Sequence, residues 1–121
     1  EGRDCDRWNM LHPDKKPRIP YVSKVLEGKS GPMIAATDYI KNYAEQLRPY
    51  VPGAYKVLGT DGFGRSDTRE KLRKHFEVNR YYITVAALKS LADEGGISTK
   101  EVVKAIDKYA IDPDKANPLH V

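Results

Sequence analysis

A glycine-rich turn between an apolar run and a helix start most constrains what this chain can fold into. Residues 58–70 read LGTDGFGRSDTRE and follow an apolar run that starts at Tyr55. Asp67 is placed to cap a helix, and Glu70, three residues later, completes the pattern of a capping box. The segment therefore predicts a strand over residues 55–60, a sharp turn that glycine permits, and a short helix beginning at Asp67.

A second apolar run precedes the first and predicts its neighbour in a sheet. Residues 32–36 (PMIAA) form a short continuous apolar segment, which is typical of a buried parallel strand. Thr37 or Asp38 is expected to cap the helix that follows. The inward face of that helix has helical spacing and consists of Ile40, Tyr43, Ala44 and Leu47. Strand, helix and strand predict a βαβ unit.

The C-terminal third predicts two helices. Residues 81–85 have strand propensity, but apolar side chains spaced four apart continue through them, and Gly95 ends the run like a C-cap. We therefore predict one helix from about Asn79. Ser98 and Glu101 form a second capping-box pattern. The inward side chains of the second helix are expected to be Val102, Val103, Ile106 and Tyr109.

The N-terminal part is polar, charged and interrupted by prolines. Residues 1–19 predict an extended arm, in which the large apolar side chain of Trp8 is an anchor for docking on a surface. Residues 21–26 predict a short helix. We therefore divide the chain into residues 1–30, an arm with a short helix, and residues 31–121, an α/β domain.

Composition excludes several classes of protein. The chain has 121 residues, enough for one core, a net charge of +4, and no apolar run near the ~18 residues that span a bilayer. Cys5 is its only cysteine, so no internal disulfide forms and a reducing cytoplasm is the expected compartment. The three histidines are far apart and lack the paired spacing of a metal site.

Positive charge is densest in the segment from Arg65 to Arg80. Acidic residues interrupt this basic face, which indicates a solvated helix surface with Glu70–Lys74 and Arg73–Glu77 pairs at i,i+4. The alternative is an independent α/β module that binds a nucleic acid or a protein through this face.

Two polar clusters invite a chemical hypothesis. The GxxGxG spacing of the turn is not that of a phosphate loop, and Asp61 and Asp67 already bring negative charge, so we interpret the turn as structural, with Phe63 projecting from it. Asp38 and Asp61 follow the two predicted strands and would meet at one edge of the sheet as a carboxylate pair for a metal or a shared proton. Capping is the commoner role of such aspartates and is the interpretation we favour. Tyr81 and Tyr82 are interpreted as packing residues rather than a stacking platform.

Several long motifs occur in the order found in one enzyme family. The sequences DCDRWNMLHP, PRIPYVSKVL, TDYIKNYAEQLRPYVP, GTDGFGRSDTRE, VAALKSLADEGGI and IDPDKANP cover nearly the whole chain. The chain resembles the C-terminal domain of the homodimeric bacterial pyruvate dehydrogenase decarboxylase components, which belong to the transketolase-like thiamine-diphosphate enzymes. The resemblance implies a three-layer α/β/α domain with a mixed sheet, incomplete here because its first strands are missing from the chain.

The resemblance also implies a function for a longer parent. The parent would convert pyruvate to CO2 and acetyl-dihydrolipoyl groups on an acyltransferase core, using thiamine diphosphate and magnesium bound by its other domains. This fragment would be inactive alone and would hold no catalytic, cofactor-binding or metal-binding residue. Its expected partners are the remaining domains, the homodimer mate and the lipoyl acyltransferase core, with no nucleic acid and no membrane. The candidate interface residues are Trp8, Asp61, Phe63, Gly64 and Ser66, and Gly64 is expected to need a positive φ or a close approach.

Overall fold

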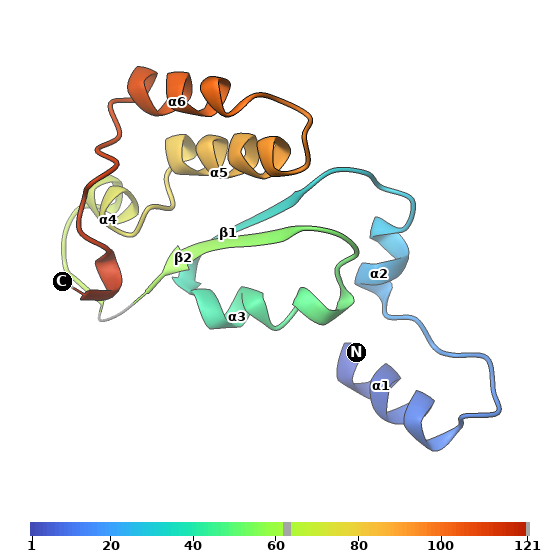
Figure 1. The fold of residues 1–121 in the computed structure, drawn as a ribbon. Helices are drawn as coiled ribbons and strands as arrows, with labels where there is room; N and C mark the ends of the chain where they lie inside the picture. Colours follow the sequence, from blue (N-terminus) through green and yellow to red (C-terminus); the bar gives the residue numbers. More distant parts are fainter. Residues whose placement is uncertain (62–63, 121) are drawn as a thin grey trace.

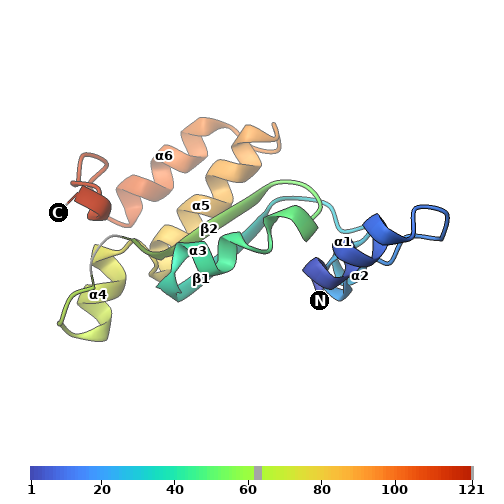
Figure 2. The same ribbon diagram turned by 90° about the horizontal axis from the view of Figure 1, so that it is seen from below.

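A two-stranded parallel sheet lies at the centre of the computed structural model, which describes residues 1–61 and 64–120. The strands are β1 (Met33–Ile40) and β2 (Tyr55–Thr60). Figure 1 shows α3 (Lys41–Glu45) against one face of this sheet and α5 (Arg80–Asp93) against the other, with α6 (Thr99–Lys108) outside α5. Figure 2 views the same layers from the α3 side. The predicted parallel βαβ unit is confirmed.

The core lies between the sheet and α5. Its buried cluster consists of Leu58 on β2 and of Phe76 and Val78 on the segment that leads into α5. Partly buried side chains pack around this cluster, namely Ile34, Leu72, Tyr82, Ile83 and Ala86. The cluster therefore fixes the position of the N-terminal end of α5 over the sheet.

β1 is longer than the sequence indicates, and the helix after it is shorter. The strand runs through Thr37 and Asp38 to Ile40, and neither of the two predicted caps begins a helix. An irregularity in the pairing between Ala36 and Ile40 allows this extension. The expected inward face is wrong in part, because Tyr43 is 67% exposed and Ile40 and Leu47 are exposed as well. A 3₁₀ turn at Arg48–Tyr50 leads on to β2.

Side-chain caps determine where the later helices begin. Thr68, not Asp67, is the N-cap of α4 (Arg69–His75), with its hydroxyl accepting from the Lys71 backbone nitrogen. Asp67 accepts from the Thr68 nitrogen instead. The predicted caps of α5 and α6 are confirmed: Asn79 accepts from two backbone nitrogens, and Ser98 accepts from that of Lys100.

The helix α6 turns a narrower face inward than its spacing indicates. Val102 and Ala105 are buried, whereas Val103, predicted to face inward, is 54% exposed. Glu101 does not complete a reciprocal box, since its carboxylate forms an ion pair with Lys104.

The N-terminal residues differ most from expectation. Where an extended arm was predicted, α1 (Gly2–Leu11) is a helix, and it begins without a side-chain cap. The predicted short helix is confirmed as α2 (Tyr21–Leu26). The whole is an incomplete α/β domain, and none of the helices in the described ranges has the length and apolar character needed to cross a membrane.

Candidate functional site

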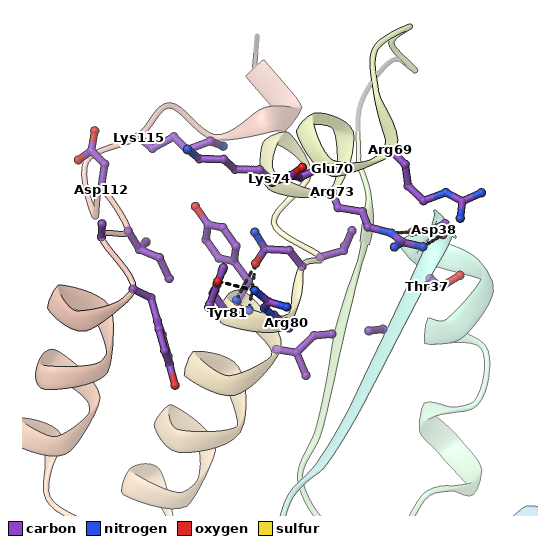
Figure 3. A pocket seen from close by; sticks show the side chains of 18 residues that line it. Thr37, Asp38, Arg69, Glu70, Arg73, Lys74, Arg80, Tyr81, Asp112 and Lys115 are labelled. Atoms are coloured by element: carbon purple, nitrogen blue, oxygen red, sulfur yellow. Dashed lines mark hydrogen bonds and ion pairs between the residues drawn. The ribbon is translucent and has the colours of Figure 1, made fainter.

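A cleft of about 1090 Å³ opens between β1, α4, the start of α5 and the segment after α6. Figure 3 shows Arg73 and Asp38 at one side, Lys74 and Lys115 along another edge of the view, and Arg80 and Tyr81 between them. The cleft therefore collects charged and aromatic side chains from segments far apart in the sequence.

An ion pair joins the two walls formed by β1 and α4. Arg73 donates from Nε and Nη2 to the two carboxylate oxygens of Asp38, at 3.1 and 2.9 Å. The hydrogen bond from Arg73 lowers the pKa of the Asp38 carboxyl below its ordinary value. The predicted Arg73–Glu77 pair does not form, because Glu77 accepts from Lys115.

A lysine ties the C-terminal segment to the end of α4. Lys115 Nζ donates to the backbone oxygen of His75 at 2.9 Å and to Glu77 Oε1 at 3.3 Å. Glu77 holds a positive φ of 61°, which an L-residue adopts only under constraint. Burial lowers the pKa of His75, and the positive charges of Arg65 and Lys115 lower it further. The cleft edge is thus electropositive.

Three tyrosines from α5 and the end of α6 add aromatic surface to the cleft. The rings of Tyr81 and Tyr109 have centroids 5.0 Å apart, and the Arg80 guanidinium carbon lies 4.8 Å from the Tyr81 centroid. Arg80 Nη2 also donates to the Tyr81 hydroxyl at 2.7 Å. Burial raises the pKa of Tyr82 above its ordinary value. The two tyrosines predicted as packing residues are half-buried, as expected.

The two aspartates proposed as a carboxylate pair each lie beside a different cation. Asp38 contacts Arg73, and Asp61 lies 3.7 Å from Lys41 Nζ. Within residues 1–61 and 64–120, no group of three histidine, cysteine, aspartate or glutamate side chains is placed to hold a metal ion. Neither aspartate caps a helix, so the capping interpretation is wrong too.

The glycine turn differs from expectation in which glycine is needed. Gly64 has no positive φ and has open space where a side chain would stand. Gly59, inside β2, is the constrained position, because a Cβ there would lie 2.9 Å from the Tyr39 backbone oxygen. Ser66 is exposed in the turn. Phe63, the predicted anchor, lies outside the described residues.

Trp8 is far from this turn. Its ring stacks on His12, with centroids 4.3 Å apart, and the Arg18 guanidinium carbon lies 4.1 Å from its centroid. Figures 1 and 2 both place α1 and α4 at opposite ends of the molecule. The structure does not bring the candidate interface residues into one site.

Sequence reasoning found part of the cleft and missed the rest. The basic face of residues 65–80 includes Arg69, Arg73 and Lys74, but its spacing does not show that these side chains border a cavity. Lys115 and Tyr109 were missed, since only their positions in the fold connect them to α4 and α5. The single lysine between the prolines of the C-terminal tail was the one signal available.

Comparison with known proteins decides the family. The family model described as the transketolase-like TK C-terminal domain matches residues 6–79, which is more than half of the chain. The chain belongs to the transketolase-like C-terminal domain family. The family expected from the motifs is therefore confirmed, as is the incomplete α/β domain.

Similar proteins carry one name. The chain is 60% identical to the pyruvate dehydrogenase E1 component of Cupriavidus necator over 121 residues, 58% to that of Pseudomonas aeruginosa over 120, and 57% to that of Escherichia coli K12 over 119. These matches cover 98–100% of this chain but only 13–14% of each relative. The alternative of an independent binding module is not favoured, because the similarity to an enzyme component runs through the whole chain.

Proposed function

We propose that this chain is the C-terminal part of the E1 component of a bacterial pyruvate dehydrogenase complex, working in the cytoplasm. The observation that carries the proposal is an identity of 57–60% to E1 components along essentially the entire chain. The parent enzyme would decarboxylate pyruvate and pass the acetyl group to lipoyl groups of the acyltransferase core, with thiamine diphosphate and magnesium as cofactors.

The chain's own part in this reaction is structural. The described residues do not fit a magnesium–diphosphate site, because they include no cluster of three potential metal ligands and because the Asp38 carboxylate is taken by Arg73. The cofactors would therefore be bound by the remaining domains of the parent, and the chain alone would be inactive. Residues 31–121 would form the α/β unit, and residues 1–30 the segment that joins it to those domains.

An exposed apolar surface supports a role in assembly. The side chains of Tyr39, Ile40, Tyr43 and Leu47, around the end of β1 and α3, are between 44% and 69% exposed. Such surfaces are typical of contacts with another domain or subunit. We place the homodimer mate and the other domains of the parent against the chain here and at the candidate residues Trp8, Asp61, Phe63, Gly64 and Ser66.

A chimaeric enzyme tests the proposal. This chain would replace its counterpart in the Escherichia coli E1 component, and pyruvate decarboxylation and acetyl transfer to lipoyl groups would be measured in the reconstituted complex. We expect activity within about threefold of the parent, because substitutions that preserve volume and pattern cost little. A folded dimeric chimaera without activity would contradict a purely structural role.

The interface role of the glycine turn has its own test. In the full-length enzyme, Phe63→Ala should lower activity at low protein concentration, and activity should recover as concentration drives the subunits together. Ser66→Ala is the matched control at a neighbouring turn position. A fall in kcat at saturating protein, with the dimer intact, would show that the turn acts on the chemistry instead.

A further inference from the structure

The cleft between β1, α4, α5 and the C-terminal segment holds more positive than negative charge. Its basic lining residues are Arg69, Arg73, Lys74, Arg80 and Lys115, and its acidic ones are Asp38, Glu70 and Asp112. Figure 3 shows these cations coming from more than one side of the cleft. An anion placed in it would therefore be surrounded rather than contacted from one face.

Several of these cations are free to bind a ligand. Within residues 1–61 and 64–120, neither Arg69 nor Lys74 has an ion pair or a side-chain hydrogen bond. Arg80 donates only to a neutral hydroxyl. Arg73 is the one arginine of the cleft whose charge a carboxylate already offsets. The electrostatic excess is thus available to an incoming group.

The walls of the cleft are held in place without a ligand. The Arg73–Asp38 pair ties α4 to β1, and the hydrogen bond from Lys115 to the His75 backbone oxygen ties the C-terminal segment to α4. A volume of about 1090 Å³ lies near the upper end of the range for small-molecule sites. A concave, pre-formed cavity of this size suits a small molecule better than a flat protein surface.

Apolar side chains line the same cavity. Val78 is buried, and Ile83 and Ile111 are half-buried, and all three border the cleft together with the tyrosine rings. A ligand that consists of charge alone would leave this surface uncovered. An apolar or planar body beside an anionic group would cover it.

We propose that this cleft binds a small organic phosphate, with the phosphate on Arg69, Lys74 and Arg80 and an apolar body against Val78, Ile83 and Ile111. Arginine and lysine bind phosphate through charge-assisted hydrogen bonds. The proposal does not depend on the enzyme assignment, since it uses only the geometry and charge of the cleft.

Two probes with the same head group separate the two parts of the site. Titration of the ¹⁵N-labelled chain with phenyl phosphate should shift the amide signals of Asn79 and Ile83 and leave those of α1 unchanged. For so small a ligand we expect saturation at about millimolar concentration. Inorganic phosphate should shift the same signals with about tenfold weaker affinity, because it lacks the ring. Equal affinities would refute the apolar subsite.

Charge removal tests the phosphate contacts. The double variant Arg69→Ala and Lys74→Ala should bind phenyl phosphate about 10- to 100-fold more weakly. Lys29→Ala with Lys100→Ala removes the same net charge from exposed positions outside the cleft and should change the affinity by less than about threefold. Equal losses in the two variants would show unspecific attraction and overturn the proposal.

Calorimetry on the full-length polypeptide keeps the test decisive if a variant of the isolated chain unfolds. Saturating thiamine diphosphate and Mg²⁺ would be present, so that a cofactor site elsewhere does not take up the probe. The same ranking of the two variants supports the proposal. Absence of saturable binding up to about ten times the expected concentration would refute it, as would an oligonucleotide that binds more tightly than phenyl phosphate with a steep salt dependence.

Discussion

Replacement of Gly59 by alanine should destabilise the fold, because β1 leaves no room for a side chain at this position. A methyl group on Gly59 would lie 2.9 Å from the backbone oxygen of Tyr39 and 3.0 Å from Thr37 Cγ2. The nearer atom belongs to the backbone of the paired strand, so the crowding is relieved only if the strand itself moves.

The size of the effect follows from two opposing terms. Overpacking a close contact costs about 1–3 kcal/mol, and the reduced entropy of the unfolded chain returns about 0.4–1 kcal/mol. We therefore expect Gly59→Ala to lower the free energy of unfolding by about 1–2 kcal/mol. Urea unfolding followed by circular dichroism measures this as a lower midpoint with an unchanged slope.

Gly64→Ala is the matched control. Gly64 has no positive φ, and no heavy atom lies within 4 Å of the place that a methyl group would take, so alanine there should be neutral or stabilising by up to about 1 kcal/mol. Equal midpoints for the two variants would refute the argument that close strand approach requires glycine at position 59.

Three further perturbations test the core, a cap and an ion pair. Phe76→Ala should lower the free energy of unfolding by about 3–4 kcal/mol, since Phe76 is 7% exposed within the buried cluster; a loss below about 1 kcal/mol in urea unfolding would place the core elsewhere. Asn79→Ala should cost about 1 kcal/mol by the same assay, because its side chain accepts from two backbone nitrogens, and an unchanged midpoint would contradict that role. The folded-state pKa of Asp38 is lowered, so its contribution is present above the unfolded pKa and is lost as pH falls through the folded one. Wild type should therefore lose more stability than Asp38→Asn between about pH 5 and pH 2.5, and equal losses would show that the pair with Arg73 adds nothing.

Local signals explain why the C-terminal helices were predictable. Asn79 caps α5 and Gly95, with φ of 80°, follows its end, so the chemistry of the two ends outweighs the strand propensity of residues 81–85. Ser98 likewise begins α6. In each case the residue that decides the boundary lies within a few positions of it.

Contacts between distant segments explain what the sequence did not predict. β1 continues through Thr37 because its backbone pairs with β2, although the local pattern favours a helix there. The Arg73–Asp38 pair joins residues 35 positions apart, and the Lys115–His75 bond joins residues 40 apart. Periodicity reports only on neighbours along the chain, so it did not show that the basic face borders a cleft.

The attachment of α1 to Tyr50 has a consequence for hydrogen exchange. The Tyr50 hydroxyl donates to Asp6 Oδ2 at 2.6 Å, and its ring occupies the space where Gly2 would carry a Cβ. Release of this one tyrosine would uncouple α1 from the sheet without disturbing the Leu58–Phe76–Val78 cluster. Amide protons of α1 should then exchange by local opening, at a lower free energy than the strand amides, which exchange only when the sheet separates. The chain would thus open in two steps, and the first of them would depend on a single aromatic ring.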